Sequence, residues 1–317
     1  MKQGNAATVG LYLLAPLLFA SNMIGARWLA GDVPPVTLAF GRWAIAAIVL
    51  LPIVWRYLDD VRAMWRTRKT DLLLLGLLGG VMSVAPQYAA AQYTQAGHIA
   101  LVFALTPVLV SLIERAVWKV QMSPQVLCGA AIAFLGIGVS AFEGSVARLM
   151  QVSVNPGDLL ALVAVIAWAS YTARLKRQPV PLPPLALLWV CASIAAMLLL
   201  PVAAIELSVN TPSEFLTIKA AAGVVFLALI AGIAAYFIYG RVVTLLGPAR
   251  ASTAMYLVPV YALFLGFLLL HETLHLYHLA AVILVLTGVA MATVHWPGRL
   301  NFPHRTRSTT AGRAIDL

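Results

Sequence analysis

Long apolar stretches separated by short polar segments form the main pattern along this 317-residue chain. A helix needs about 20 predominantly apolar residues to cross the hydrocarbon core of a bilayer. The pattern predicts ten such helices, over residues 9–30, 35–55, 72–93, 98–118, 124–143, 157–175, 184–205, 220–243, 249–270 and 276–296. We therefore expect an all-α integral membrane protein.

Composition supports this fold class. Hydrophobic residues make up 62% of the chain and charged residues only 10%, with a mean hydropathy of +0.92. A soluble domain carries roughly a quarter charged residues. The net charge of +10 does not indicate nucleic-acid binding, because the basic residues stand between the apolar stretches, as in membrane proteins. Cys128 and Cys191 each lie inside an apolar stretch and indicate neither a disulfide nor a metal site.

Lysine and arginine positions predict the orientation in the membrane. If the N-terminus is cytoplasmic, only Arg27, Arg42, Arg148 and Lys219 fall on the outer side, which leaves 17 of the 21 basic residues inside. Cytoplasmic loops are enriched in Lys and Arg, so we expect a multi-pass protein of the bacterial inner membrane with both termini cytoplasmic. The first apolar stretch lacks a small-residue cleavage site and is expected to remain as a helix.

A weak internal repeat relates two parts of the chain. Residues 94–140 align without a gap on residues 246–292 when Pro107 is placed on Pro259. Both segments contain an apolar stretch with a proline inside it, a short polar link and a second apolar stretch with a glycine. Many transporters are built from two such halves.

Each half would contain five predicted helices. Because five is an odd number, the second half would enter the membrane from the opposite face, which makes the repeat inverted. The predicted units are a first repeat over residues 1–148, a second over residues 149–297, and a basic cytoplasmic tail over residues 298–317. An inverted pair encloses a substrate site near the middle of the membrane and exposes it to each side in turn.

The repeat carries residues that match a known pattern. The second copy contains Ala251, Ser252, Thr253, Ala254, Leu257, Pro259, Val260, Leu270, Glu272, Thr273, Leu274 and Gly288, and the first contains Pro107, Val108 and Gly136. These residues resemble the half-repeat of the EamA type in the drug/metabolite transporter superfamily. The first copy departs from it, because Val120 stands where the second copy has Glu272. Arg42 resembles the arginine that opens the second helix in this family.

The resemblance covers residues 9–296. It implies ten transmembrane helices in two inverted five-helix repeats around a central cavity, and transport of a small molecule. Within the superfamily, the polar third helix is similar to that of bacterial exporters of aromatic amino acids, which implies an amino acid that leaves the cytoplasm. The chain has no phosphate-binding P-loop motif, so ATP is not expected to drive transport.

Polar and aromatic side chains inside the predicted helices are candidates for the substrate site, since polar groups are costly to bury in a membrane. The candidates are Ser21, Asn22, Gln87, Tyr88, Gln92, Tyr93, Thr106, Trp168, Tyr171, Tyr239 and Tyr256. Tyr88 and Gln92 would share one face of a helix. Thr106 and Tyr256 lie close to prolines at corresponding places in the two halves, where transporter helices are often broken. Ser21 and Asn22 could equally well form hydrogen bonds between helices.

Several other side chains have alternative interpretations. Arg42 could attract a substrate carboxylate, but a salt bridge to Asp32 or extension toward the membrane surface fits equally well. Glu114 could carry a proton, although pairing with arginines at the inner surface is the better interpretation. His98 is interpreted as a solvated helix cap and not as a titrating group. Trp43 is interpreted as an anchor at the membrane interface.

Residues His271 to His275 spell the sequence HExxH. On a helix, its two histidines can bind zinc and its glutamate can act as a general base. The transporter half-repeat already accounts for Glu272, and His275 falls in a short polar link between two predicted helices. We therefore expect no metal, no cofactor and no enzymatic activity, with an intramembrane metalloprotease as the remote alternative.

Together these features predict a secondary transporter that exports small amphiphilic metabolites by alternating access. Aromatic or other apolar amino acids are the expected substrates, since the predicted cavity is polar, neutral and rich in aromatic side chains. A multidrug or cation exporter of the same superfamily is the alternative, and it would need an acidic residue deep in the cavity. The predicted partners are the substrate and the lipid bilayer, with no nucleic acid. The uniformly apolar fifth and tenth helices would pack at the periphery and could form a homodimer contact.

Overall fold

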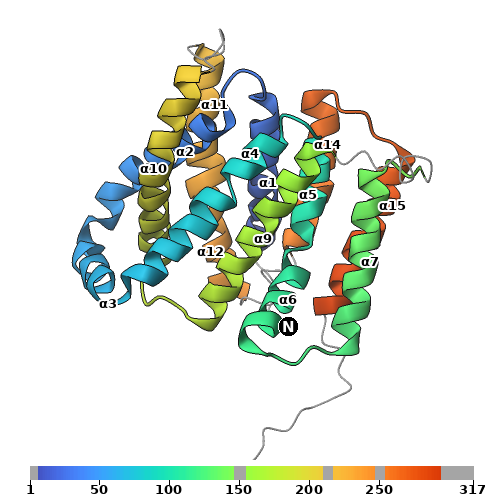
Figure 1. Cartoon of the computed structure of the whole chain (residues 1–317), viewed down its shortest axis with the longest axis horizontal. Coiled ribbons are helices and arrows are strands. Elements are labelled where there is room, and N and C mark those ends of the chain that lie inside the picture. The colour runs from blue at the N-terminus through green and yellow to red at the C-terminus, as the bar shows by residue number, and fades with distance from the viewer. Residues whose placement is uncertain (1–5, 146–154, 210–216, 247–253, 294–317) are drawn as a thin grey trace, which may run out of the picture.

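The computed structural model describes residues 6–145, 155–209, 217–246 and 254–293, and over these residues the chain forms helices and no β-strand (Figure 1). The first part contains α1 (Ala6–Trp28), α2 (Pro35–Val54), η1 (Trp55–Tyr57), α3 (Leu58–Gly76), η2 (Leu77–Met82), α4 (Ala85–Ala90), α5 (Ala96–Ala104), α6 (Thr106–Trp118) and α7 (Pro124–Ala141). The second contains α9 (Pro156–Arg177), α10 (Pro184–Val209), α11 (Ile218–Ala228), η4 (Leu229–Ala234), α12 (Ala235–Leu246), η5 (Met255–Leu257), α14 (Val258–Leu270) and α15 (Leu276–Thr293). The predicted tail at 298–317 and the small residues at 251–253 lie outside the described residues.

Six described segments are long and apolar enough to cross a membrane: Ala6–Trp28, Pro35–Ala90, Pro124–Ala141, Pro156–Arg177, Pro184–Val209 and Ile218–Leu246. A seventh is obtained when α5 and α6, which are bent by 41° where they meet, are taken as one span. The last two apolar segments, Met255–Leu270 and Leu276–Ala292, are shorter. The predicted class, an all-helical membrane protein, is confirmed. The number of candidate spans among the described residues is lower than the ten predicted helices, partly because Pro35–Ala90 is a single segment of 56 residues.

Prolines set the start of several helices. Pro35, Pro124 and Pro156 each begin a helix, in the first turn, where a backbone N–H would have no helical partner. Ser123 and Asn155 cap two of these helices, because their side-chain oxygens accept backbone N–H groups of the first turn. These local signals explain why the observed starts agree closely with those predicted from the sequence.

The bend between α5 and α6 also has a local cause. Pro107 has no N–H to donate to the carbonyl of Phe103, one turn earlier. The Thr106 hydroxyl donates to that carbonyl instead, at 2.6 Å. The chain can therefore bend here without leaving the Phe103 carbonyl unsatisfied.

Several elements of the first part of the chain have a counterpart in the second part. The separation between counterparts is the same as that between Pro107 and Pro259. At this separation both bounds of α6 fall on those of α14, and both bounds of α7 fall on those of α15. The two π-helical segments, η2 and η4, coincide in the same way. The matching bounds thus follow the gapless alignment found in the sequence.

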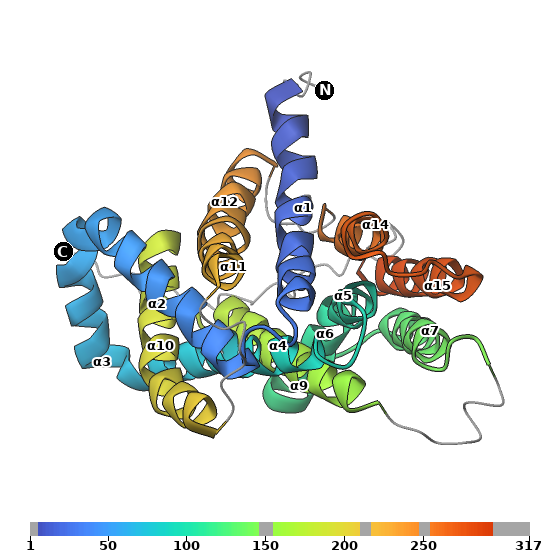
Figure 2. The same ribbon diagram turned by 90° about the horizontal axis from the view of Figure 1, so that it is seen from above.

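α7 and α15 pack against each other at one edge of the molecule (Figure 2). A Cβ built on Gly129 would lie 2.5 Å from the carbonyl oxygen of Gly288, and one built on Gly288 would lie 2.5 Å from the carbonyl oxygen of Gly129. Small residues allow helix backbones to approach this closely in membranes. The two helices expected at the periphery thus pack on each other through glycine.

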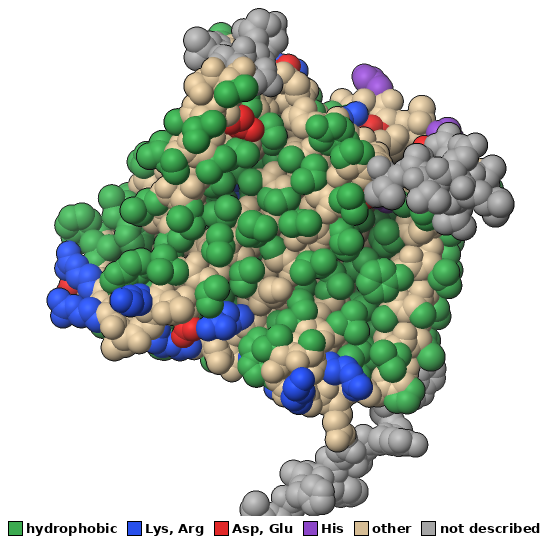
Figure 3. All heavy atoms as spheres, in the orientation of Figure 1, with side chains coloured by type: hydrophobic (Ala, Val, Ile, Leu, Met, Phe, Trp, Pro, Cys, Tyr) green, Lys and Arg blue, Asp and Glu red, His purple; other side chains and the backbone are tan. Residues whose placement is uncertain are grey.

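Apolar side chains cover the middle of the molecular surface (Figure 3). Lysine and arginine side chains gather along the lower edge in the same view. α3 contributes the exposed Arg62, Arg66 and Lys69 to the basic residues, and the end of α9 contributes Lys176 and Arg177. This distribution fits a chain whose apolar band lies in lipid and whose basic residues lie at one end of the band.

The predicted location of Trp43 at the membrane interface is wrong. It is 1% exposed, and its indole N–H donates to the carbonyl of Gly80 at 2.8 Å. Gly80 lies in the π-helical η2, where the wide turn disrupts the regular pattern of helical hydrogen bonds. Trp43 therefore links α2 to η2 in the core and does not anchor the membrane interface.

Candidate functional site

Three side chains from three helices meet in a buried polar cluster: Asn22 on α1, Arg42 on α2 and Tyr88 on α4. The Arg42 Nη1 group donates to the Asn22 side-chain oxygen and to the Tyr88 hydroxyl, both at 2.9 Å. The Tyr88 hydroxyl donates to the same Asn22 oxygen at 2.9 Å. All three residues are buried. Asn22 therefore does form the hydrogen bonds between helices that the sequence allowed.

Arg42 has no negatively charged partner among the described residues, although it is only 3% exposed. Its guanidinium carbon lies 4.6 Å from the ring centre of Trp43, and its Nε atom is buried without a hydrogen-bond partner in this part of the chain. Asp32 pairs with Lys219 instead, at 2.5 Å. The predicted alternatives for Arg42, a salt bridge to Asp32 and extension to the membrane surface, are therefore wrong.

Five aromatic side chains form a second cluster. α1 contributes Phe19, α9 contributes Trp168 and Tyr171, and α12 contributes Tyr236 and Tyr239. The ring centre of Tyr236 lies 5.5 Å from that of Phe19 and 6.3 Å from that of Trp168. Trp168 stacks on Tyr171 at 5.2 Å, and Tyr239 meets the edge of Phe19 at 6.0 Å. All five side chains are half-buried, so three helices present aromatic surface at one place.

The polar and aromatic clusters adjoin each other at η4 and the first turn of α12. A Cβ built on Gly232 would lie 3.6 Å from Arg42 Nε. Tyr236, four residues later, lies in the first turn of α12. We call the two clusters together the central site, which consists of Phe19, Asn22, Arg42, Tyr88, Trp168, Tyr171, Tyr236 and Tyr239.

Several predicted residues lie in or beside the central site. Those within it are Asn22, Tyr88, Trp168, Tyr171 and Tyr239. Gln87 precedes Tyr88 on α4, is 3% exposed, and has a side-chain nitrogen without a hydrogen-bond partner among the described residues. The sequence did not single out Phe19 or Tyr236 as site residues. The sequence offers a signal for Phe19, because the first predicted helices of the two halves align with Phe19 on Trp168, at a separation of 149 residues and not the 152 between Pro107 and Pro259.

Other predicted residues are placed elsewhere. The Ser21 hydroxyl donates to the carbonyl of Leu18 within α1 at 2.8 Å, and Thr106 stabilises the bend before Pro107 as described above. Both hydroxyl groups are therefore satisfied within their own helices. Tyr256 is half-buried in η5.

Gln92 and Tyr93 do not continue the face of α4. The helix ends at Ala90, and a turn follows. Tyr93 is 58% exposed, and its carbonyl accepts a hydrogen bond from the Asn155 side chain at 3.1 Å. The prediction that Tyr88 and Gln92 share one helix face is wrong, because the helix stops between them.

A separate polar pocket of about 180 Å³ lies at helix ends away from the central site. It is lined by Arg27, Tyr93, Thr94, Gln95, His98, Ser140, Ala141, Glu143, Asn155, Asp158, Tyr277 and His278. His98 is only 5% exposed; its Nδ1 lies 2.7 Å from the Ser140 hydroxyl and its Nε2 lies 3.0 Å from Asp158 Oδ1. The interpretation of His98 as a solvated cap is therefore wrong, since side chains from α7 and α9 cover it.

Two segments of the chain, residues 7–142 and 155–294, match the model of the EamA-like transporter family. The chain belongs to this family. Among its relatives, the uncharacterized transporter YyaM of Bacillus subtilis is 23% identical over 270 residues, which cover 84% of this chain and 87% of YyaM. The uncharacterized inner membrane transporter YedA of Escherichia coli is 27% identical over 278 residues, or 85% of this chain and 84% of YedA. Protein PecM of Dickeya dadantii is 26% identical over 284 residues, which cover 87% of this chain and 88% of PecM.

A solved crystal structure shares the fold. It superposes with a TM-score of 0.57 at 20% sequence identity, covering 90% of this chain and 97% of the other. The family and the relatives identify this EamA-like protein as a membrane transporter. Their names specify no substrate, so the narrower likeness to exporters of aromatic amino acids is a proposal.

The HExxH sequence of this transporter does not form the helix that zinc chemistry requires. α14 ends at Leu270, His271 has a left-handed backbone (φ 55°), and residues 271–275 are not helical. Two histidines separated by such a turn do not share a helix face. No group of three or more metal-ligating side chains is found in the described part of the chain.

Glu272 has a different role in the structure. Its carboxylate accepts the backbone N–H of Ala96 at 3.1 Å, at the start of α5, and lies 3.8 Å from Arg27 Nε. Burial raises the pKa of Glu272, and these partners offset only part of the effect. Glu272 is therefore a helix cap that joins α14 to α5 and α1.

Glu114 is buried at the opposite end of the molecule. Its two carboxylate oxygens pair with Lys176 Nζ at 2.9 Å and with Arg177 Nε at 2.6 Å. The interpretation that Glu114 pairs with basic residues near the inner surface agrees with this geometry. Its charge is already balanced by two cations from α9.

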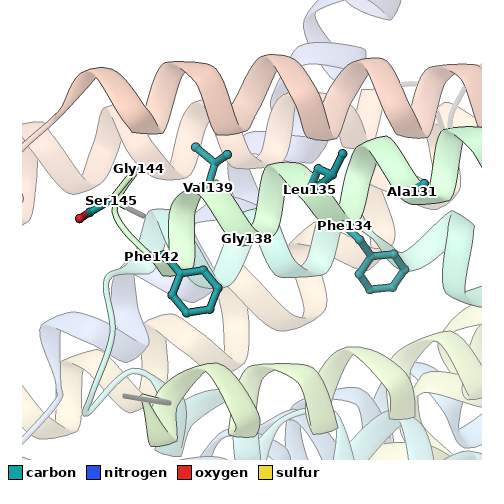
Figure 4. A pocket seen from close by; sticks show the side chains of 8 residues that line it. All are labelled: Ala131, Phe134, Leu135, Gly138, Val139, Phe142, Gly144 and Ser145. Atoms are coloured by element: carbon teal, nitrogen blue, oxygen red, sulfur yellow. The ribbon is translucent and has the colours of Figure 1, made fainter. Parts of the chain in front are cut away.

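A larger cavity, of about 620 Å³, lies along α7 and is apolar (Figure 4). It is lined by Ala131, Phe134, Leu135, Gly138, Val139, Phe142, Gly144 and Ser145. Phe134 and Phe142 point to the side of α7 away from the helix that packs above it in this view. Among the described residues that line this cavity none is charged, so they offer apolar surface and no group that would recognise a charged substrate.

Proposed function

We propose that this EamA-like protein is a secondary transporter that exports small amphiphilic metabolites, with aromatic and other apolar amino acids as the first candidates. The observation that carries the proposal is the aromatic cluster of the central site. Flat, half-buried rings from α1, α9 and α12 offer stacking surface to a flat apolar side chain. The adjoining polar cluster offers hydrogen-bonding groups to the polar end of the same molecule.

The proposed architecture is ten transmembrane helices in two inverted halves, residues 1–148 and 149–297. The recurrence of α6, α7 and η2 at the separation of Pro107 from Pro259 supports it, as do the two separate segments that match the family model. Five spans in each half place the second half upside down relative to the first. In this arrangement both termini are cytoplasmic, in the bacterial inner membrane.

The aromatic cluster is where the two proposed halves would meet. Phe19 on α1 and Trp168 on α9 align when the first helices of the two halves are compared, and Tyr236 contacts both rings. A site between inverted halves can be exposed to each side of the membrane when the halves rock against each other. Alternating access therefore follows from the proposed architecture.

The cation-exporter alternative is weakened by one observation. A site for a hydrophobic cation needs a free carboxylate in the cavity. Glu114, the deep acidic residue available, is paired with Lys176 and Arg177. The charged group at the central site is instead a cation, Arg42.

The test is uptake of radiolabelled phenylalanine and tryptophan into liposomes that contain the purified protein, with and without a pH gradient. Saturable uptake is expected, and an effect of the gradient would show that protons are coupled. Trp168→Ala should raise the apparent KM by about tenfold, because a stacking partner is lost. Trp55→Ala is the matched control, since Trp55 is 69% exposed and outside the central site. No uptake of either amino acid by the wild-type protein would refute the substrate assignment.

A further inference from the structure

Arg42 differs from the other arginines whose ion pairs the structure describes. Arg27 lies near Glu272, Arg68 and Arg174 pair with Asp71, and Arg177 pairs with Glu114. Arg42 is the most deeply buried of these cations, at 3% exposure, yet its hydrogen-bond partners in the described structure are neutral. A buried charge without a counter-charge is strongly destabilising in a protein and more so in a membrane.

The neutral partners hold one edge of the guanidinium and leave the other edge unused. Nη1 makes both hydrogen bonds, to Asn22 and Tyr88. Nε makes none to the described residues, and no hydrogen bond joins Nη2 to them. The Nε–Nη2 edge is one of the two forks with which arginine binds both oxygens of a carboxylate.

This unused edge faces the part of the molecule that carries the aromatic rings. A Cβ built on Gly232 would lie 3.6 Å from Nε and 3.9 Å from Nη2, so η4 approaches this edge at a glycine. Tyr236, one turn further on, is in contact with Phe19 and with Trp168. An anion at the fork would thus lie next to the aromatic surface.

We propose that Arg42 binds the carboxylate of the transported molecule, which makes the substrate a carboxylic acid with an apolar side chain. The inference rests on the proposed function and narrows its substrate class. Asn22 and Tyr88 are positioning residues, because they fix the guanidinium so that its Nε–Nη2 edge faces η4. The edge is closed in this conformation, and movement of η4 and α12 away from α2 opens it during transport.

The first experiment compares molecules that differ only in the carboxylate. Thermal unfolding of the purified wild-type protein is measured with 3-phenylpropionate and with 3-phenylpropanol at equal concentrations. The acid should raise the melting temperature and the alcohol should not. In liposomes, phenylalaninamide and phenethylamine should compete with labelled phenylalanine at least about tenfold more weakly than phenylalanine itself, because a charge-assisted bond is lost.

Substitutions test whether Arg42 is the residue that binds the carboxylate. Arg42→Gln should abolish the stabilisation by 3-phenylpropionate, and Arg42→Lys should retain a weakened response, since it keeps the charge but loses the fork. Lys219→Gln is the matched control, because it removes a cation that pairs with Asp32 outside the central site. If Arg42→Gln does not fold, the comparison of acid with alcohol on the wild-type protein still tests carboxylate binding, and Arg42→Lys tests the role of Arg42.

The outcomes separate this inference from the proposed function. Phenylalanine uptake that phenylalaninamide inhibits as strongly as phenylalanine would overturn the carboxylate site and leave the proposed transport function intact. Absence of amino acid uptake, together with Arg42-dependent stabilisation by 3-phenylpropionate, would overturn the amino acid assignment and support the carboxylate site. Equal stabilisation of the wild-type and Arg42→Gln proteins by the acid would overturn the role of Arg42.

Discussion

Lys119 and His271, which the repeat aligns, share one backbone conformation. Lys119 ends α6 with φ 57° and His271 ends α14 with φ 55°, both in the left-handed region. Each backbone N–H donates to a carbonyl in the last turns of its own helix, on Glu114 and Gly266 respectively. This motif satisfies a helix-end carbonyl and turns the chain sharply. Two helices therefore end in the same way although their side chains there differ.

The same positions also relate two buried carboxylates. Gly266 stands in the repeat where Glu114 stands in the first copy, and a side chain at Gly266 would collide with the Glu272 carboxylate. The Glu272 side chain thus folds back into the space that corresponds to Glu114. Glu114 pairs with Lys176 and Glu272 lies near Arg27, two basic residues separated by the same 149 positions as Phe19 and Trp168 in the first helices of the two halves.

Glycine at either left-handed cap should stabilise the protein. A side chain in this conformation costs about 1–2 kcal/mol, which glycine avoids. We expect Lys119→Gly and His271→Gly each to raise the melting temperature of the purified protein. Val117→Gly is the control and should lower it, because Val117 is exposed and helical, where glycine costs about 0.5–1 kcal/mol. A lower melting temperature for His271→Gly would mean that its side chain makes a stabilising contact.

Transport should survive the His271→Gly change as well. The HExxH sequence is not helical here, so no zinc chemistry depends on it. Uptake of labelled substrate by the variant should match that of the wild type, with and without a chelator. Loss of uptake on chelation would contradict the structural assignment of this segment.

Glu272 should make stability depend on pH. Its pKa in the folded protein lies above the ordinary glutamate value of 4.5 because the carboxyl is buried. The folded state then binds more protons than the unfolded state between 4.5 and the raised pKa, so stability falls as pH rises through this interval. Thermal unfolding of Glu272→Gln across this interval should show a flatter profile than the wild type.

Glu206→Gln is the matched control for that profile. Glu206 also caps a helix, since its carboxylate accepts the backbone N–H groups of Val36 and Thr37 at 3.2 and 2.7 Å. The wild-type dependence on pH should remain in this variant. A profile that flattens equally in both variants would mean that Glu272 is not its source.

The contact between α7 and α15 should tolerate no methyl group at Gly129. A Cβ there would lie 2.5 Å from the Gly288 carbonyl, so one helix must move. We expect Gly129→Ala to destabilise the protein by about 1–3 kcal/mol. Gly138→Ala, on the same helix, is the control, because a Cβ there meets nothing within 4 Å. It should be neutral or slightly stabilising when both variants are compared by thermal unfolding.

Thr106 should affect the bend and not the substrate. Thr106→Val removes the hydroxyl that satisfies the Phe103 carbonyl and should cost about 1 kcal/mol of stability. Thr106→Ser keeps the hydroxyl and should behave like the wild type. The apparent KM for substrate should be the same in all three proteins. A raised KM in Thr106→Val alone would place this residue at the substrate site.

Sequence patterns were sufficient to predict the class of this protein and much of its local structure. Apolar stretches in a chain with few charges predict membrane helices, because the bilayer core leaves no other way to satisfy the backbone. Prolines such as Pro35 and Pro124 predict helix starts, because the residue itself lacks the N–H. Both kinds of signal act over a few residues, so they can be identified without knowing the fold.

The roles of individual side chains depend on contacts between helices that are distant in the sequence. Hydropathy assigns Trp43 to an interface and leaves Arg42 three possible places, because neither residue's neighbours along the chain are its neighbours in space. Burial of Arg42 depends on α1, α2 and α4 meeting, which brings Asn22 and Tyr88 to it. The interpretation of the HExxH motif likewise depended on the observed φ of His271. This single left-handed residue ends the helix that zinc binding by the motif would require.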